Sequence, residues 1–152
     1  MQRLAILIAA VTSLGAFSLT AMAAPPTGLN APVQPSTPTV GSEIKRGADA
    51  ADRCGTLYTM PTSADGFAAC VDARQSANRQ SAGVGYEAFD IGLYFMAKAN
   101  IGVAIDILSK AGRDVAVLRA RMNLYEVRYR QARDKLNLTD AEAEKGAYIG
   151  GM

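Results

Sequence analysis

The chain has 152 residues, of which 49% are hydrophobic and 20% charged, and this length suits one modest domain. It contains no His, which excludes Ser-His-Asp and Cys-His hydrolases and any zinc, copper or haem site that needs an imidazole ligand. Lys and Arg number 16 and Asp and Glu 14, so bulk charge identifies no partner and only local clusters of charge are informative.

The first 23 residues have the pattern of a secretory signal peptide. Arg3 precedes an uncharged apolar run over residues 4–19, and the triplet Ala21-Met22-Ala23 follows as a cleavage site. We therefore expect cleavage after Ala23 and a periplasmic or secreted product. An uncleaved membrane anchor is the alternative for this segment.

Residues 24–42 contain five of the six prolines, together with Gly, Ser and Thr. Such a segment buries too little apolar surface to offset its ordering entropy, so we expect a disordered arm that serves as a tether. Pro32 and Pro35 also satisfy P-x-x-P, which leaves a proline-rich recognition peptide as an alternative.

Cys54 and Cys70 are the two cysteines of the chain. An even number in an exported protein predicts one disulfide, worth roughly 3 kcal/mol at this separation. We expect it to join a short Ala-rich helix that starts near residue 43 and ends at Gly55 to a second helix. Thr62 or Ser63 would cap that second helix, which runs to about residue 77.

Residues 86–111 form the most hydrophobic part of the chain after the signal, with apolar side chains on every side of a helix. A helix of this kind is buried among neighbours or crosses a membrane. Lys98 and Asp106 leave no uncharged run of about 20 residues, so we expect the core and treat a membrane span as the minor alternative.

Within this stretch the spacing of Ile91-Gly92, Phe95, Asn100-Ile101 and Ala104 resembles one tetratricopeptide unit. The resemblance covers about residues 88–111, and no second copy follows at a spacing near 34. It implies a helix pair that turns at Ala99-Asn100, with Gly92 as the small residue that admits the second helix. One uninterrupted helix over residues 86–110 is the other interpretation.

Gly112 predicts a helix end and Asp114 a cap for the next helix. Apolar residues then recur at steps of three and four over residues 115–136, which predicts the seam of a coiled coil or antiparallel helix pair. After a stop at Asn137, Thr139 and Glu142 predict a capping box for a final helix through Lys145, with Gly146, Gly150 and Gly151 fraying the end. The seam residues are Val115, Leu118, Met122, Tyr125, Tyr129, Ala132 and Leu136.

The same helix carries the clearest cluster of charge. Residues 113–135 hold seven basic and three acidic side chains, and Arg121, Arg128 and Lys135 lie along one flank of the seam. We expect a binding surface for carboxylate or phosphate made of Arg119, Arg121, Arg128 and Arg130. A solvated helix face without a binding role is the alternative.

Three sets of carboxylates could support acid and base chemistry: Glu87 with Asp90, Glu142 with Glu144, and Asp106 within the apolar segment. Acids in the first turn of a helix or a structural ion pair explain them more simply. We therefore expect no catalytic residues, no metal and no cofactor.

The sequence predicts an all-α fold over residues 43–152, a small bundle or hairpin array of four to five helices with one disulfide. As a function we expect a non-enzymatic module that engages an envelope or secreted protein with an acidic surface, or self-associates through the 115–136 seam. Binding of an anionic envelope polymer or head group through residues 113–135 is the alternative, and a carboxylate-only hydrolase a further one. Nucleic acid is not an expected partner, and membrane association is a minor option.

Overall fold

The computed structural model describes residues 37–55, 64–81 and 86–150. These residues contain five α-helices and no strand, which confirms the all-α prediction and the expected disulfide-linked helical bundle. The signal peptide and the arm up to residue 36 lie outside the described residues. The helices are α1 Val40–Asp52, α2 Ala64–Gln80, α3 Tyr86–Lys110, α4 Ala116–Lys135 and α5 Asp140–Ile149.

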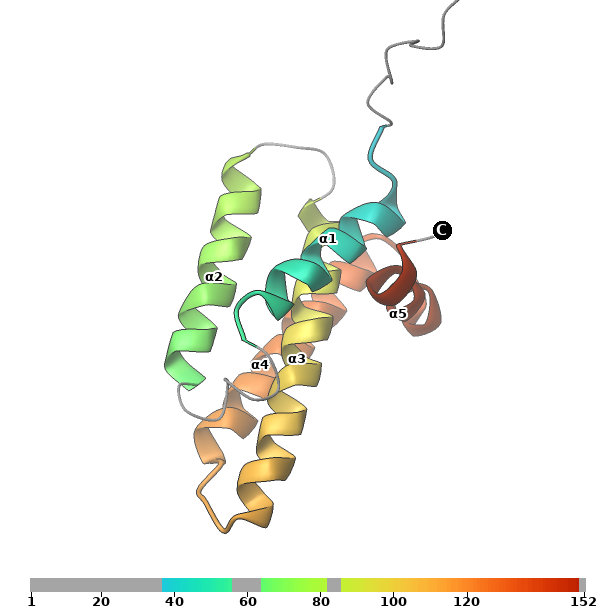
Figure 1. The fold of residues 1–152 in the computed structure, drawn as a ribbon. Coiled ribbons are helices and arrows are strands. Elements are labelled where there is room, and N and C mark those ends of the chain that lie inside the picture. The colour runs from blue at the N-terminus through green and yellow to red at the C-terminus, as the bar shows by residue number, and fades with distance from the viewer. Residues whose placement is uncertain (1–36, 56–63, 82–85, 151–152) are drawn as a thin grey trace, which may run out of the picture. The chain divides into compact units, whose positions relative to one another are not determined.

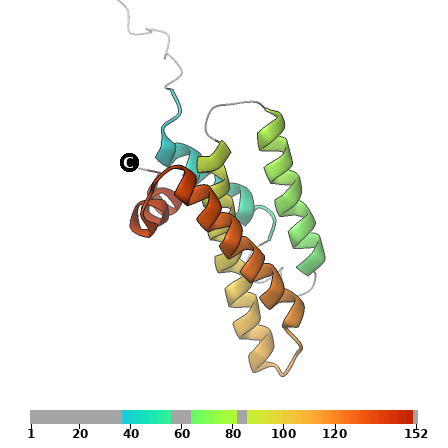
Figure 2. The same cartoon turned by 180° about the vertical axis from the view of Figure 1, so that it is seen from behind.

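α3 is the central helix of this unit. In Figure 1, α1 crosses in front of it, α4 runs behind it and α2 stands to one side, and the view from behind in Figure 2 shows α4 nearest the viewer. Because neighbours cover α3 on several sides, its apolar residues are buried around much of its circumference. This position explains why residues 86–110 show no polar face in the sequence.

α1 begins three residues earlier than the sequence predicted, at Val40. Thr39 accepts a hydrogen bond from the main-chain N–H of Ser42, and the Ser42 hydroxyl accepts one from the N–H of Thr39. This reciprocal capping satisfies main-chain donors that would otherwise lack partners. Residues 40–42 therefore belong to the helix and not to the expected arm.

α1 and α3 approach so closely that their main chains are in contact. A Cβ added to Gly47 would lie 1.9 Å from the carbonyl oxygen of Phe89, and one added to Gly92 would lie 1.8 Å from that of Ile44. Gly92 thus has the role of a small residue that admits a neighbouring helix, but the helix it admits is α1.

α3 runs without interruption through Ala99 and Asn100, so the single-helix interpretation of this stretch applies and the expected turn is absent. The buried Asn100 side chain instead donates hydrogen bonds to Asp52 Oδ1 at 3.0 Å and to the carbonyl oxygen of Gly55 at 3.5 Å. These bonds fasten α3 to the end of α1. By length and composition α3 could cross a membrane, but half of its most apolar stretch is buried against other helices.

The predicted seam of α4 packs within the chain. Leu118, Tyr125, Tyr129 and Ala132 are buried, and Tyr125 stacks against Tyr94 of α3 with ring centres 5.6 Å apart. These four side chains of the 115–136 seam therefore pack into the core of this same chain. The predicted cap at Asp114 is wrong, because the N-cap of α4 is Val115, which makes no side-chain cap hydrogen bond; Asp114 precedes it and accepts a hydrogen bond from the main-chain N–H of Ala116 at 2.9 Å.

α5 starts with the predicted capping box of Thr139 and Glu142, but it extends beyond Lys145 to Ile149. The expectation that Gly146 frays this end is wrong, because Gly146 is buried against the Ile44 side chain, with 3.0 Å from its Cβ position to Ile44 Cδ1. The helix ends at Gly150, whose φ of 65° only glycine adopts easily.

α2 is held differently from the other helices. Its buried apolar side chains are few, Phe67, Ala68 and Val71, and it continues three residues past the predicted end near Ala77 to Gln80. The disulfide between Cys54 and Cys70, with Cα atoms 5.6 Å apart, ties it to the end of α1. Ion pairs and polar hydrogen bonds supply much of the remaining attachment.

Candidate functional site on α4

The basic flank of α4 faces carboxylates of the same chain. Arg121 lies 3.6 Å from Asp65 and Arg128 lies 2.9 Å from Asp72, both carboxylates belonging to α2. The acids are seven residues apart, as are the two arginines, so the two rows match in register. The sequence predicted a partner with an acidic flank. In the structure, Asp65 and Asp72 of the same chain contact the basic flank.

Arg128 is the most enclosed of these arginines, with 33% of its side chain exposed. Besides Asp72, it donates a hydrogen bond to the Tyr94 hydroxyl at 3.3 Å, and its guanidinium lies 5.4 Å from the centre of the Tyr94 ring. Burial raises the pKa of Tyr94 to about 12, an effect that the positive charge of Arg128 opposes. Arg128 therefore belongs to the α2–α3–α4 junction.

Arg130 is tied to its own helix and to α3 through Glu126. That carboxylate accepts a hydrogen bond from Lys98 Nζ at 2.6 Å and another from Arg130 Nε at 2.6 Å. The bond from Lys98, aided by the one from Arg130, lowers the pKa of Glu126. The three side chains together carry one net positive charge.

The end of α4 carries a further network with the start of α5. Arg133 pairs with Asp134 at 2.8 Å and also with Asp140, and the Tyr129 hydroxyl donates a hydrogen bond to Asp140 at 3.0 Å. The bond from Arg133 is the main reason that the pKa of Asp140 is lowered. Lys135 lies 4.0 Å from Glu87, which brings the third member of the basic flank to a carboxylate of α3.

Arg119 differs from the other three candidate residues. It is exposed and makes no ion pair with any residue in the described part of the chain, as is also true of Arg113 before the helix. The outer side of α4 carries three exposed apolar side chains, Val117, Leu124 and Val127, at 58%, 36% and 52%. Figure 2 shows that no other described helix covers this face.

The carboxylates singled out in the sequence have mainly structural contacts. Asp106 is exposed and pairs with Lys110 at 2.6 Å, and Glu142 caps α5. Asp90 is buried, and its Oδ2 accepts hydrogen bonds from Gln75 at 3.0 Å and Arg79 at 3.2 Å. A buried carboxylate needs partners of this kind to offset the loss of hydration.

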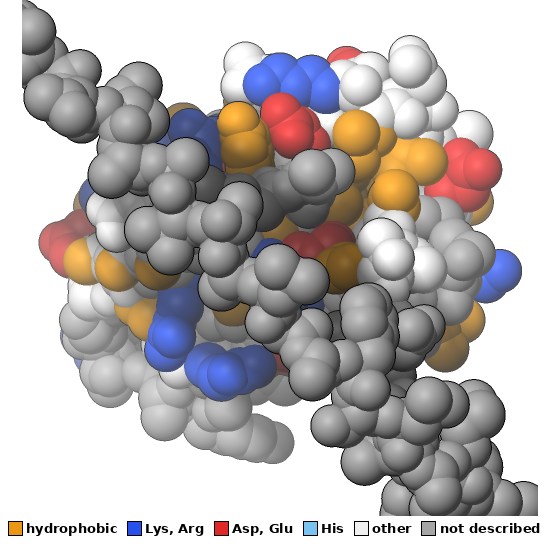
Figure 3. Space-filling model, turned by 90° about the horizontal axis from the view of Figure 1, so that it is seen from above, with side chains coloured by type: hydrophobic (Ala, Val, Ile, Leu, Met, Phe, Trp, Pro, Cys, Tyr) orange, Lys and Arg blue, Asp and Glu red, His pale blue; other side chains and the backbone are white. Residues whose placement is uncertain are grey.

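Glu87 and Asp90 line a groove of about 240 Å³ between α2, α3 and α4. Arg79, Arg128 and Lys135 line the same groove, so each carboxylate in it has a basic neighbour. Among residues 37–55, 64–81 and 86–150, no three Asp, Glu or Cys side chains come together as metal ligands. On the end of the unit seen in Figure 3, basic, acidic and apolar side chains are interspersed, and neither sign forms a continuous patch among the visible coloured atoms.

The chain matches no protein-family model, no curated protein and no solved structure. The residues that sequence reasoning missed are Asp65 and Asp72, which neutralise much of the basic flank. Their seven-residue spacing equals that of Arg121 and Arg128, and comparing the charge periodicity of the two helices would have revealed the match.

Proposed function

We propose that this chain is an exported, non-enzymatic binding module that engages another cell-envelope protein through the outer face of α4. The export signal in the sequence supports the compartment, and a disulfide between Cys54 and Cys70 is the kind of bond that persists in oxidising surroundings. The fold itself does not determine a function, so the proposal depends on the surface.

The observation that carries the proposal is the exposure of Val117, Leu124 and Val127 on one side of a helix. Exposed apolar side chains grouped on one face are typical of a protein interface, where an apolar centre is surrounded by a polar rim. The partner's apolar centre would cover the three side chains.

Binding of an anionic polymer or head group through residues 113–135 has less support. Of its four candidate residues, Arg121, Arg128 and Arg130 already hold carboxylates of this chain. A polyanion would have to displace these carboxylates, and only Arg119 would be available without such exchange. A hydrolase built on Glu87 and Asp90 has less support still, because Asp90 is occupied by Gln75 and Arg79.

The proposal is tested by affinity capture from the native envelope fraction. Three baits are compared: the wild type, an α4 variant and a matched control. The α4 variant carries Val117→Gln, Leu124→Gln and Val127→Gln. The control carries Val103→Gln and Ile107→Gln, which are exposed apolar residues of α3. We expect the wild type and the control to recover the same partner and the α4 variant to lose it.

Raising the salt concentration separates the two binding hypotheses. An interface with an apolar centre should lose little binding, whereas contacts to a polyanion weaken steeply with salt. Equal recovery by all three baits would overturn the proposal, and recovery that disappears with salt would favour the anionic ligand.

A further inference from the structure

A second groove lies between α1 and α2, on a part of the molecule that the α4 surface does not include. Its volume is about 330 Å³, several times the share of one water molecule in the liquid. Three of its lining side chains are arginines, and among the described residues no carboxylate lines it. The lining consists of Arg46, Ala50, Arg53, Arg74, Ala77, Asn78, Ser81 and Phe89.

The three arginines have much of their hydrogen-bonding capacity free. The Arg74 side chain is exposed and makes no ion pair or hydrogen bond within the described residues. Arg53 donates only to the main-chain oxygen of Asp49, at 3.3 Å. The guanidinium carbon of Arg46 lies 4.5 Å from the centre of the Phe89 ring, and this contact holds the guanidinium at the groove wall.

Arg46 has existing partners in Glu43, at 3.0 Å from its Nε, and in the buried Asn78. Arg46 forms an ion pair with Glu43, and its contacts use Nε and Nη2, so an anion can bind Arg46 through the free Nη1 group without displacing Glu43.

Arg46 and Arg53 lie toward the two ends of the groove, and Arg74 lies between them on the α2 wall, because α2 meets α1 at Asn78 beside Arg46 and at Cys70 beside Cys54. Arg46 and Arg53 are seven residues apart on α1, which places them about 10 Å apart along the helix axis. Ala50 lies between Arg46 and Arg53 on α1, and Ala77 lines the groove from α2. The small alanine side chains leave space between the arginines.

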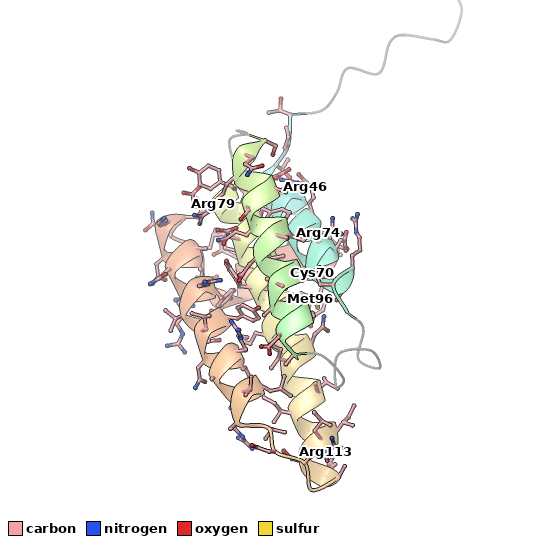
Figure 4. The ribbon with its side chains drawn as sticks, turned by 90° about the vertical axis from the view of Figure 1, so that its left-hand side faces the viewer. Arg46, Cys70, Arg74, Arg79, Met96 and Arg113 are labelled. Carbon is pink, nitrogen blue, oxygen red and sulfur yellow. A yellow bond between two sulfur atoms is a disulfide. The ribbon has the colours of Figure 1, made fainter. Side chains whose placement is uncertain are left out.

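The disulfide fixes the width of the groove at one end. Cys54 directly follows Arg53, and Cys70 lies one helical turn before Arg74, so the bond joins the two walls beside these arginines. Figure 4 shows Arg46, Arg74 and Cys70 following one another along the boundary between α2 and α1. Reduction would free the two walls to separate.

We propose that this groove binds a small elongated anion whose phosphate or carboxylate groups meet Arg46 at one end, Arg53 at the other and Arg74 between them. Guanidinium groups hold the oxygens of such anions through paired hydrogen bonds. Asn78 and Ser81 supply further polar contacts at the Arg46 end. A free oligophosphate and the head group of an anionic lipid share this chemistry.

The test is calorimetric titration at about 0.1 M ionic strength, where charges more than about 10 Å apart are largely screened. The probes are inorganic phosphate, inorganic tripolyphosphate, and vesicles of phosphatidylcholine with or without phosphatidylglycerol. We expect tripolyphosphate to bind more tightly than phosphate, because it reaches further along the groove. Binding of the phosphatidylglycerol vesicles alone would assign the ligand to a lipid head group.

The variant Arg53→Gln with Arg74→Gln should weaken the binding at least tenfold. Its matched control, Arg113→Gln with Arg119→Gln, removes two exposed arginines elsewhere and should change the affinity less than twofold. Reduction of the disulfide should weaken binding as well, in the wild type but not in the groove variant.

Three results would overturn the proposal: no binding of any probe by the wild type, equal losses in the two variants, or an affinity that reduction leaves unchanged. Circular dichroism of each variant confirms that the helices remain. None of these measurements involves a protein partner, so failure of this groove and failure of the α4 surface are distinguishable.

Discussion

The carbonyl oxygen of Ile44 occupies the space that a side chain on Gly92 would need, 1.8 Å from where its Cβ would lie. Because that oxygen is main chain and part of α1, it cannot rotate away as a flexible side chain would. α1 can therefore lie this close to α3 only because residue 92 is a glycine, which has no side chain.

Gly92→Ala should destabilise the fold by about 3 kcal/mol, since the two helices must separate to admit a methyl group. The control is Gly102→Ala in the same helix, where the nearest atom, Met122 Sδ, is 4.0 Å away. That change should be neutral or stabilising by up to about 1 kcal/mol, because Ala favours helix. Urea unfolding of both variants checks this, and equal stabilities would contradict the close crossing.

Leu118 and Leu124 of α4 are a matched pair that tests which side of the helix is buried. Leu118 is 5% exposed and Leu124 is 36% exposed. We expect Leu118→Ala to cost about 2 to 5 kcal/mol of unfolding free energy, and Leu124→Ala to cost less than about 1 kcal/mol. A larger loss for Leu124→Ala would show that the outer face of α4 is the buried one.

Arg128 and Asp72 should show a measurable but modest coupling. Since half of the Asp72 side chain is exposed, a double-mutant cycle with alanine should give about 0.5 to 1 kcal/mol, and added salt should reduce it. Arg119→Ala should stay within about 0.5 kcal/mol of the wild type, because no ion pair within the described residues is lost. A coupling energy of zero at low salt would mean that α2 does not meet α4 as described.

Alkaline pH should unfold the protein. Burial is the main cause that raises the pKa values of Tyr94, Tyr125 and Tyr129 from 10.0 to about 12. The unfolded chain therefore loses these protons before the folded chain does, so the stabilisation is complete below pH 10 and is lost as the pH rises toward 12. Unfolding free energies measured along a pH series, with phenolate absorbance followed in parallel, should show the decline over this window. Stability that stays constant across it would contradict the burial of these hydroxyls.

Reduction of the Cys54–Cys70 disulfide should lower the unfolding free energy by roughly 3 kcal/mol, through the entropy that the unfolded chain regains. α2 should respond most, because few of its apolar side chains are buried. Hydrogen exchange of the reduced protein should be faster in α2 than in α3. Titration of the denatured, unreduced chain should find no free thiol, and two free thiols would contradict the link.

Local signals in the sequence predicted the helices well. Thr139 and Glu142 lie three residues apart and form their capping box, and Gly112 with φ 68° ends the turn after α3 as a left-handed residue should. The spacing of Leu118 and Tyr125 correctly gave the buried side of α4. In each case the interaction spans a few residues, so the pattern that predicts it is present within one segment.

Contacts between distant segments could not be predicted in this way. Gly47 and Gly92 are far apart in the sequence, and neither has a local pattern that indicates the other. The sequence around Gly146 predicted a frayed helix end. The residue that packs on Gly146, Ile44, belongs to α1, so no local pattern indicated this contact. The arginines of α4 suggested an open binding surface for the same reason, since Asp65 and Asp72 reach them only through the fold.

The pairing of α2 with α4 has a consequence for any acidic helix that approaches from outside. Asp65 and Asp72 are joined covalently to the arginines they meet, so they act as a competitor with an effective concentration on the order of millimolar. A weakly binding acidic helix at micromolar concentration loses this competition. Asp65 and Asp72 therefore prevent weakly binding acidic ligands from reaching Arg121 and Arg128. Binding of a partner depends on surfaces that α2 does not cover.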